Sequence, residues 1–452
     1  MDAAIGAAPL LRRLDLAQVA SDPDAAADRR SLIRRGALPD AAVRAAVRGI
    51  LDEMRADPDS ALRDLAARFG GGRSDGTPLV ERSAILEARD RLAPGVRRAL
   101  EAASDAVRRV SLAGAPASVV VETAKGVTVE RRWAPLDAVG CYVPGGGAPY
   151  PSTLVMTVVP ALAAGVGRIV VATPAGRSGD VDPVVLGAAG VLGIDTVLVA
   201  GGAQAIGALA FGLPRAGLAP VDRIVGPGNA WVTAAKLELV GEVSIDLPAG
   251  PSEGVVLVDG GADPDRAAAD LLTQAEHGPD SPVLLVTTDV ALASAVERAV
   301  MARLAGAARR AVLEQSLSRH GRIILAPDLD TAIAFINDYA PEHLSIDVGP
   351  LEATVAGIRN AGSVFVGPWA PESAGDYATG ANHVLPTGGL ARSCGALAVE
   401  TFGRFVQVQR LTRDGLAGLR ATIGTLAEAE GLLAHRDAVE VRFAAAGSGG
   451  GR

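Results

Sequence analysis

The sequence predicts an α/β protein with two parallel-sheet halves, flanked by helical segments. Short β-branched runs alternate with helical segments twice along the chain, starting near residue 139 and again near residue 254. Such alternation is typical of parallel sheets whose strands are connected by helices. The turn-forming stretch Ala249-Gly250-Pro251-Ser252 separates the two series. A length of 452 residues, of which 49% are hydrophobic and 21% charged, suits two soluble globular domains.

Helices are expected to dominate the first 110 residues. Residues 1–36 are polar and rich in Arg, Asp and Ala, which predicts one or two short helices. Two helical patterns fill residues 40–69, and the second begins at Asp57-Pro58-Asp59 and ends at Gly70-Gly71-Gly72. A third helix is predicted from about residue 94 to 110.

The expected strands follow in chain order. Alternating side chains predict a hairpin at residues 118–122 and 127–132, around Lys125-Gly126. The first half has strands at residues 139–143, 168–173, 196–200 and 223–225. The second half has strands at residues 254–258, 283–287, 322–325 and 363–366, and one more begins at Leu344. From Leu411 onward the chain is helical and charged, and its glycine-rich end, residues 447–451, is expected to be disordered.

Composition excludes several classes of protein. The net charge is −8 without a basic stripe, so neither a nucleic-acid surface nor an anionic-membrane surface is expected. Cys141 and Cys394 lack CxxC spacing, which excludes a cysteine zinc site, and both are interpreted as small buried residues. The N-terminus lacks a signal-peptide pattern, and the most apolar window, residues 153–166, is too short to span a bilayer. We therefore expect a cytoplasmic protein.

Gln274 and His277 lie at the end of a predicted helix that Gly278-Pro279 terminates. Being three residues apart, the two side chains share one face of its last turn. An amide oxygen and an imidazole could hold a metal ion there, and the C-terminal carbonyls of the helix favour a cation. Taken alone, however, such a pair is also typical of a solvated polar cap.

Glu342 and His343 lie on a helix-to-strand corner that follows Pro341. A carboxylate beside an imidazole supplies two possible bases that work near neutral pH, although a surface ion pair has the same pattern. Asp376 follows the last strand of the second half, in a glycine-containing loop. Its carboxylate suits Zn²⁺, or it forms a turn.

Two polar residues of the C-terminal helical segment, Glu430 and His435, are interpreted as solvated when read alone. A candidate ligand set nevertheless emerges, with one amide, two imidazoles and one carboxylate: Gln274, His277, Asp376 and His435. These are borderline ligands of the kind that Zn²⁺ accepts. Their spacing alone does not establish the set, because it spans more than 160 residues.

Three glycine-rich loops that follow strands indicate a nucleotide site. They are Tyr142–Gly147, Gly201–Gly207 and Val225–Asn229. In such turns the backbone can approach a phosphate, and a helix N-terminus favours an anion. None has the GxGxxG pattern with a ribose-binding acid, so NAD would bind outside the standard fingerprint. The alternative is that they are structural turns.

Eight motifs in order carry a resemblance to a known family: YVPGGGAPYPST (142–153), GGAQAIGALA (201–210), VGPGNAWVTAAK (225–236), IDLPAGPSE (245–253), QAEHGPDS (274–281), YAPEHL (339–344), ESAGDYATGANHVLPT (372–387) and EAEGLLAH (428–435). Through them the chain resembles the histidinol dehydrogenases, from about Arg34 to Arg442. The resemblance implies a cytoplasmic zinc enzyme that oxidises L-histidinol, through L-histidinal, to L-histidine with two NAD⁺. This is the last step of histidine biosynthesis.

The resemblance also implies roles for individual residues. One zinc ion per subunit would be held by Gln274, His277, Asp376 and, from the partner subunit of a homodimer, His435. The acid/base pair would be Glu342 and His343. Substrate contacts would fall on Ser252, Gln274, His277, His343, Asp376, Glu430 and His435, with Glu430 also coming from the partner, and on His383. NAD contacts would fall on Tyr142, Gln204 and Asn229.

For the fold, the resemblance implies two Rossmann-like parallel-sheet domains and a C-terminal segment exchanged in a dimer. We expect an N-terminal helical segment at residues 1–36 and a first, NAD-binding α/β domain from residues 37–119 and 141–252. The second α/β domain, with the zinc and acid/base residues, would combine residues 120–140 and 253–396. Residues 397–452 would form the helical dimer-exchange segment and the disordered tail.

Rival interpretations stay open on the residues alone. A related zinc and NAD dehydrogenase could oxidise another amino or sulfonated alcohol, although Ser252 and Glu430 favour histidinol. A zinc hydrolase could use Glu342 to activate water, but it leaves the three glycine-rich loops unexplained. A catalytically silent binding protein conflicts with an intact Glu342-His343 pair.

Overall fold

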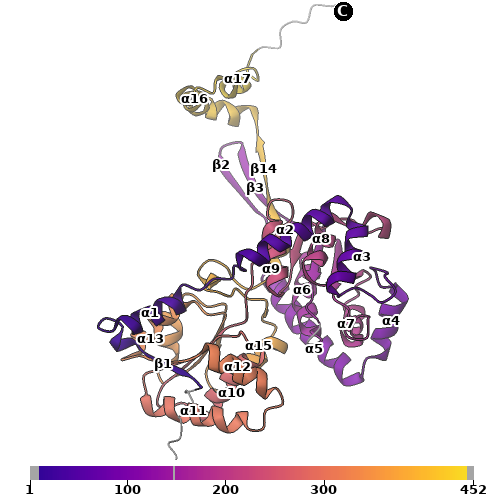
Figure 1. Cartoon of the computed structure of the whole chain (residues 1–452). Helices are drawn as coiled ribbons and strands as arrows, with labels where there is room; N and C mark the ends of the chain where they lie inside the picture. Colours follow the sequence, from indigo (N-terminus) through magenta and orange to yellow (C-terminus); the bar gives the residue numbers. More distant parts are fainter. Residues whose placement is uncertain (1–9, 146–147, 445–452) are drawn as a thin grey trace, which may run out of the picture. The chain divides into compact units, whose positions relative to one another are not determined.

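The computed structural model describes residues 10–145 and 148–444, and these fall into two compact units (Figure 1). The larger unit contains residues 1–114 and 136–402, and the smaller contains residues 115–135 and 403–452. The predicted disordered end at residues 447–451 lies outside the described residues. Within the part of the chain that the structure describes, no helix has both the length and the apolarity needed to cross a bilayer.

The first sheet of the larger unit is parallel and has five strands in the order β6-β5-β4-β7-β8. Its strands are β4 (Ala138–Tyr142), β5 (Arg168–Thr173), β6 (Val197–Val199), β7 (Arg223–Val225) and β8 (Ser244–Ile245). The first four agree with the predicted strands, because they are short, mostly apolar runs whose residues are nearly all buried, as in parallel strands covered on both faces. β8 has two residues and is too short to leave a pattern.

Helices cover both faces of this sheet. One face packs against α4 (Arg82–Arg91), α5 (Pro94–Ala113), α6 (Pro151–Ala164) and α7 (Pro183–Val191). The other packs against α2 (Ala41–Ala56), α3 (Pro58–Phe69), α8 (Gly202–Phe211) and α9 (Ala230–Glu238). Successive residues of β4 alternate between the two cores: Val139 and Cys141 face one, Ala138 and Tyr142 the other. Burial raises the pKa of the Cys141 thiol to about 12, whereas Cys394 is only partly buried.

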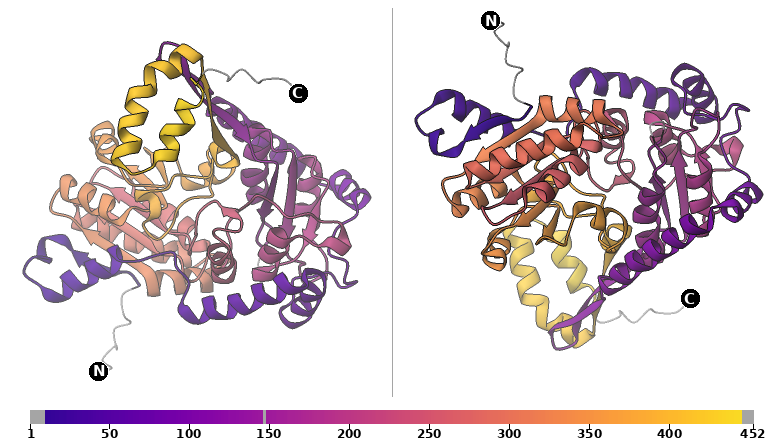
Figure 2. Two further views of the ribbon diagram at one scale, coloured as in Figure 1. Left: turned by 90° about the horizontal axis from the view of Figure 1, so that it is seen from above. Right: turned by 90° about the horizontal axis from the view of Figure 1, so that it is seen from below.

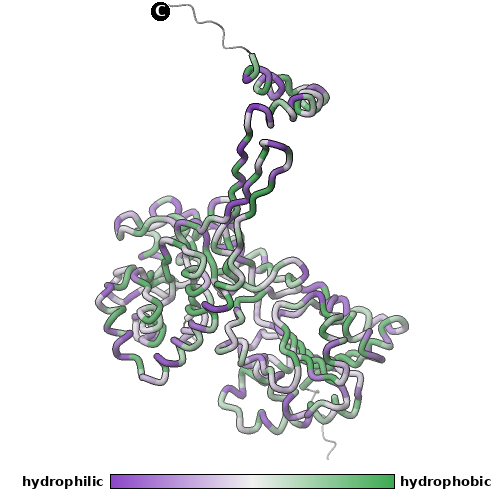
Figure 3. The backbone as a smooth tube through the Cα atoms, turned by 180° about the vertical axis from the view of Figure 1, so that it is seen from behind, coloured by the Kyte–Doolittle hydropathy of each residue, from purple (hydrophilic) through white to green (hydrophobic). Residues whose placement is uncertain are grey.

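The second sheet of the larger unit is also parallel, with six strands in the order β1-β11-β10-β9-β12-β13. Its strands are β1 (Arg12–Asp15), β9 (Gly254–Val258), β10 (Val283–Thr287), β11 (Gly321–Leu325), β12 (His343–Asp347) and β13 (Ser363–Val366). Figure 3 shows hydrophobic residues concentrated along these strands. Two parallel-sheet halves are therefore confirmed.

Both faces of the second sheet are likewise covered by helices (Figure 2). One core includes α10 (Pro264–Glu276), α11 (Val290–Leu304) and α12 (Arg310–His320), and the other includes α1 (Pro23–Ile33), α13 (Leu329–Tyr339) and α14 (Leu351–Gly357). β1 corrects the expectation that residues 1–36 are only helical. Its four residues bury just Leu14 fully, so the strand depends on pairing with β11 more than on its own pattern.

The smaller unit contains a three-stranded antiparallel sheet and two helices. Its strand order is β14-β3-β2, from β2 (Val119–Ala124), β3 (Val127–Pro135) and β14 (Gly403–Leu411), followed by α16 (Arg413–Ala429) and α17 (Leu433–Glu440). The hairpin around Lys125-Gly126 is confirmed. The expected grouping of residues 120–140 with the second α/β domain differs from the structure, because β3 pairs with β14 and β4 belongs to the first sheet. The local pattern of the hairpin does not specify that β3 pairs with β14, nor does it show which sheet β4 joins.

Candidate active site

A cleft of about 620 Å³ in the larger unit contains most of the predicted site residues. On one side it is lined by loops that follow β4 and β7, including Gly145 and Asn229. On the other side it is lined by Ser252, which precedes β9, and by the Glu342-His343 corner, which begins β12. The first sheet therefore presents the carboxyl ends of its strands to the cleft, and the second sheet presents their amino ends.

The end of α10 and the short helix α15 (Glu372–Tyr377) create a group of metal-binding type. Donor atoms of His277, Glu372 and Asp376 lie within 4.8 Å of one another. Gln274, one turn before His277, is buried, and its Nε2 donates to Ser252 Oγ at 3.1 Å. That bond leaves Gln274 Oε1 buried without a hydrogen-bond partner. A buried acceptor with no donor is unusual in a native fold, and a cation would satisfy it.

Negative charge dominates this group. Burial lowers the pKa of His277, but its 3.2 Å contact with Glu372 and the nearby charges of Glu372, Asp376 and Glu342 outweigh burial and raise the pKa to about 9. Burial and the Glu372 charge raise the pKa of Asp376 to about 6. Perturbed titration of this kind is characteristic of functional clefts, and here it indicates a site that attracts positive charge.

Glu342 is buried beside Ser252 and Glu253. One carboxylate oxygen, Oε2, accepts hydrogen bonds from Ser252 Oγ at 2.7 Å and from the Glu253 N–H at 2.9 Å. Burial nevertheless raises the pKa of Glu342 to about 8, because it outweighs these two bonds and the His277 charge, and the Glu253 charge acts in the same direction as burial. Glu342 therefore titrates near neutral pH, where a general base works best.

His343 is buried, and neither of its ring nitrogens has a hydrogen-bond partner. Nδ1 lies 3.6 Å from Glu342 Oε2, and Nε2 lies 3.9 Å from Asp376 Oδ1. The ring stacks on His277 with 6.1 Å between centroids. Burial lowers the pKa of His343, which keeps the imidazole neutral and able to accept a proton. Two unsatisfied nitrogens in a cleft indicate that His343 takes a partner from a bound ligand.

His383 completes this side of the cleft, with its Nδ1 3.0 Å from the Asp376 carbonyl oxygen. Burial lowers the pKa of His383 to about 4, so the ring is neutral at pH 7 and Nδ1 carries the proton that the carbonyl accepts. Glu430 and His435 belong to the smaller unit, where Glu430 caps the end of α16 and His435 lies on α17. Both are exposed.

The predicted cofactor residues lie at the carboxyl end of the first sheet. Tyr142 ends β4 and is buried, and its hydroxyl accepts from the Gly202 N–H at 3.3 Å. Gln204 is buried in the first turn of α8 and donates to the Gly70 carbonyl at 3.4 Å. Asn229 caps α9 by accepting from two backbone N–H groups, and it lines the cleft. Three strand-to-helix turns thus meet at one edge of the sheet, as nucleotide sites require.

The turn before Asn229 is held by a buried ion pair. Lys236 pairs with Asp246 and donates to the Gly226 carbonyl at 2.9 Å. Asp246 in turn accepts from the Gly226 N–H at 2.7 Å. Gly226 has a φ of 113°, and a Cβ there would lie 2.1 Å from the Tyr142 carbonyl oxygen. Only glycine allows this close approach of the loop after β7 to the end of β4.

Comparison with known proteins decides the family. The sequence model of the family Histidinol dehydrogenase matches residues 33–443. This chain belongs to the histidinol dehydrogenase family. The histidinol dehydrogenase of Methanothermobacter thermautotrophicus is 44% identical over 412 residues, which cover 91% of this chain and 96% of the relative. That of Halobacterium salinarum is 46% identical over 425 residues, covering 93% and 98%.

A solved histidinol dehydrogenase from Elizabethkingia anophelis has the same fold, with a TM-score of 0.88 and 34% identity over 97% of this chain and 99% of the other. Membership of the histidinol dehydrogenase family confirms the predicted resemblance and makes the chain an NAD-dependent oxidoreductase. In this member of the family, the predicted residues that line one cleft are Asn229, Ser252, His277, Glu342, His343, Asp376 and His383. Gln274 lies next to the cleft, where it donates to Ser252.

Glu372 belongs to the group of metal-binding type around His277, and sequence reasoning missed it. It is buried and contacts His277, which was predicted to bind metal. A signal was available, because Glu372 precedes Asp376 by four residues, and such a spacing places both carboxylates on one face of a helix. The two carboxylates and the imidazole then form one acidic cluster.

Binding of a metal ion such as Zn²⁺ to this cluster should release a proton. With a pKa of about 9, His277 is protonated near pH 7 and must lose that proton to ligate a metal. The apparent affinity for Zn²⁺ should therefore fall about tenfold for each pH unit below 9, and more steeply below about 6, where Asp376 also protonates. Titration calorimetry in buffers of different ionisation enthalpy measures the protons released.

His320 supplies the matched control, because it is a partly exposed histidine outside the cleft. His320→Ala should leave the affinity and the proton release unchanged, and His277→Ala should lose both. An affinity that does not change with pH, or full affinity in His277→Ala, would contradict this interpretation of the cluster.

Proposed function

We propose that this protein is a zinc-dependent histidinol dehydrogenase that oxidises L-histidinol, through L-histidinal, to L-histidine with two NAD⁺. The observation that carries the proposal is the sharing of one cleft by an acidic ligand cluster and an acid/base pair, both with unsatisfied polar atoms. The relatives named above support the substrate by their names. The reaction is the last step of histidine biosynthesis, and a cytoplasmic location accords with such a biosynthetic enzyme.

The donor set fits a zinc ion. Gln274, His277 and Asp376 would hold it with His435 of the partner subunit, and these amide, imidazole and carboxylate donors are borderline ligands without thiolate. When bound, Zn²⁺ would accept the imidazole and amino nitrogens of the substrate and so orient its alcohol carbon. The unpartnered Gln274 Oε1 is the feature of the structure that most directly supports such a ligand.

The opposite wall of the cleft would bind NAD⁺. Tyr142, Gln204 and Asn229 are the proposed contacts, and the N-termini of α8 and α9 lie at the same edge of the sheet. Backbone N–H groups and the helix dipoles favour the pyrophosphate there. The nicotinamide would then face a substrate held from the other wall.

His343 would act first as general base. Its neutral imidazole takes the alcohol proton while a hydride leaves the carbinol carbon for NAD⁺, which gives the aldehyde and NADH. Glu342 would then remove a proton from water as the water oxygen adds to the aldehyde carbon, while protonated His343 would return its proton to the aldehyde oxygen, which gives the hydrate and a neutral imidazole. His343 serves again when the hydrate loses a proton and a second hydride to a second NAD⁺. Two hydrides account for the four electrons between alcohol and carboxylic acid.

Ser252 and His383 would contact the substrate from this chain, and Glu430 of the partner subunit would bind its amino group. We propose that the smaller unit is the segment exchanged between two subunits, since the ligand set within the larger unit lacks the expected second imidazole ligand. Each active site of the homodimer would then use residues of both chains.

Counting NADH for each L-histidinol consumed tests the proposed function. With NAD⁺ and Zn²⁺ present, two NADH are expected, because both oxidations occur in one site. One NADH would indicate an ordinary alcohol dehydrogenase acting on this or another amino alcohol. No NADH would contradict the proposal and favour a hydrolase or a binding protein.

His343→Ala should lower kcat by roughly 10²–10⁴-fold, the usual contribution of a positioned base. Both oxidations should be affected, because the same imidazole acts twice. Stopped-flow measurements starting from histidinol and from histidinal separate the two steps, and the zinc content of the variant controls for a damaged site. Unchanged turnover in both steps would contradict the assignment of His343.

Mixing two inactive variants tests the shared site. His277→Ala and His435→Ala subunits should form hybrid dimers with one intact site, because the intact His277 and His435 then meet. Random exchange should restore about a quarter of the wild-type activity, since half of the dimers are hybrids and half of their sites are intact. Mixing His277→Ala with Asp376→Ala is the control, because both residues come from the same subunit. Recovery in neither mixture, with exchange demonstrated, would exclude a shared site.

A further inference from the structure

Arg35 makes an unusually complete set of contacts beneath the cleft. It follows α1 and directly precedes residues 36–39, which line the cleft. Its Nε and Nη2 donate to the two carboxylate oxygens of Glu253 at 2.7 and 2.6 Å. The guanidinium carbon lies 3.2 Å from the centre of the Tyr339 ring, and Nη2 also lies 3.4 Å from the Ala340 carbonyl oxygen. Bidentate and stacked contacts of this kind are specific to arginine.

Two of these contacts fall on a strained corner. Ala340 has a φ of 52° and a ψ of 67°, and it is the one non-glycine residue with positive φ in the described ranges 10–145 and 148–444. An L-residue is strained in this left-handed conformation, so the surrounding structure must hold it in place. Tyr339 and Ala340 immediately precede Pro341, Glu342 and His343. The strained residue therefore sets the direction in which the acid/base pair leaves α13.

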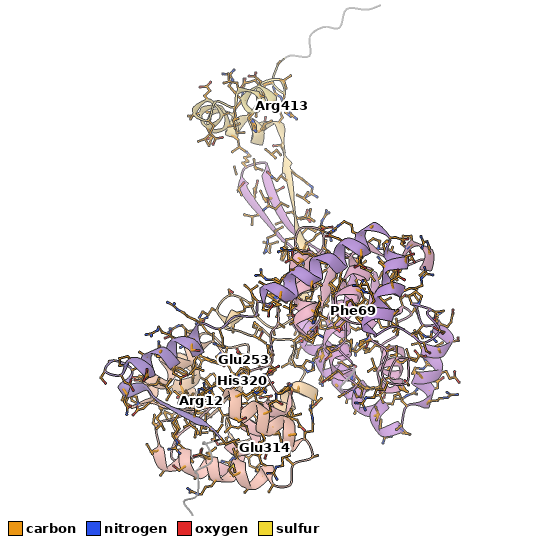
Figure 4. All side chains as sticks on the ribbon, in the orientation of Figure 1. Arg12, Phe69, Glu253, Glu314, His320 and Arg413 are labelled. Atoms are coloured by element: carbon orange, nitrogen blue, oxygen red, sulfur yellow. The ribbon has the colours of Figure 1, made fainter. Side chains whose placement is uncertain are left out.

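The third contact reaches the acid/base pair through Glu253. This residue is 2% exposed and lies inside the larger unit (Figure 4). Its backbone N–H donates to Glu342 Oε2 at 2.9 Å, and its carbonyl accepts from the His343 N–H at 3.2 Å. One residue thus holds the side chain of Glu342 and the backbone of His343. Whatever fixes Glu253 also fixes both.

Glu253 also affects Glu342 through its charge. The carboxylates of Glu253 and Glu342 are both buried, and Arg35 supplies the counter-charge to Glu253. The other titratable groups that face Glu342 are His277, the adjacent His343 and Tyr339. Removing one member of a buried ion pair leaves the other charge uncompensated, whereas removing both members does not.

We propose that Arg35 is the positioning residue of the acid/base pair, holding the corner at Tyr339–His343 directly and through its ion pair with Glu253. Arg35 itself contacts neither of the two acid/base side chains, so it acts only through these residues. The inference rests on the proposed roles of Glu342 and His343. It connects the N-terminal segment, which sequence reasoning treated as a separate helical piece, to the chemistry of the site.

Four variants of the full-length zinc-loaded enzyme test the proposal: Arg35→Gln, Glu253→Gln, the double variant that carries both, and Arg48→Gln. Arg35→Gln should lower kcat roughly 10–100-fold with little change in KM for histidinol, because misplacement of a catalytic group by about 1 Å has that effect. Arg48→Gln is the matched control, because Arg48 forms a bidentate pair with Glu238 on an exposed surface. It should retain the wild-type kcat.

The pH profile of histidinal oxidation separates positioning from general loss of structure. Glu342 must be ionised to activate water, so its pKa sets the acid limb of this profile. Glu253→Gln removes a negative charge and leaves the Arg35 cation uncompensated, and both changes favour ionised Glu342. The acid limb should therefore move to lower pH by roughly one unit. In the double variant both charges are gone, and the acid limb should return toward that of the wild type.

The outcomes distinguish this proposal from the proposed function. If the wild type forms two NADH and His343→Ala is impaired, but Arg35→Gln keeps the wild-type kcat, only the positioning role of Arg35 is overturned. An acid limb that is identical in Glu253→Gln and wild type also overturns it, and this measurement remains decisive if Arg35→Gln does not fold. Wild-type protein that forms no NADH overturns the proposed function itself.

Discussion

Four carboxylates and three imidazoles lie around one cleft, and the burial of their charges is the constraint on which the site depends. Glu253, Glu342, Glu372 and Asp376 are each less than 8% exposed. An unpaired buried charge costs several kcal/mol, so each must find a cation, a proton or hydrogen-bond donors. Arg35 forms an ion pair with Glu253, and His277 forms one with Glu372. The Glu342 carboxylate accepts hydrogen bonds from Ser252 Oγ and from the Glu253 N–H. Asp376 is left with the weakest compensation, at the point where a metal is proposed to bind.

The helix dipoles have opposite signs at the two walls of the cleft. Helices α6 and α9 begin at the wall formed by the first sheet, so their N-terminal N–H groups favour anions there. Helices α10 and α13 end at the wall formed by the second sheet, where terminal carbonyls favour cations. The proposed dinucleotide is an anion and the proposed metal ion a cation, so each would be favoured by a different end of these helices. The reacting carbon would lie between the two walls.

The fold was predictable where local pattern and tertiary role agree. Buried parallel strands such as β5 and β9 are apolar throughout, so their sequences show them almost to the residue. β14 and β1 were missed because each is stabilised by a distant strand, β3 or β11, more than by its own pattern. For the same reason, the hairpin at β2 and β3 was expected but its partner was not.

The site shows the same division. Gln274, His277, Glu342 and His343 were singled out because their motifs resemble those of a known family, whereas their spacing alone also allowed a solvated cap and a surface ion pair. The ion pair of Arg35 with Glu253 joins residues 218 positions apart, and no periodicity connects them. Glu372 has a signal at helical spacing from Asp376, but a lone glutamate has too many ordinary roles to be selected without the structure. Residues that support a catalytic group are harder to predict than the group itself.

Gln274 Oε1 and the two ring nitrogens of His343 are polar atoms that the protein itself leaves unsatisfied. Each such atom lowers the stability of the fold by about 1–3 kcal/mol relative to a satisfied one. Apolar residues of similar volume at these positions would give a more heat-resistant protein that had lost its function. The search for thermostable variants of this chain should therefore leave the cleft alone and concentrate on the outer helices. A cleft whose polar atoms await a ligand cannot also satisfy them all internally, so binding and stability place opposite demands on these three atoms.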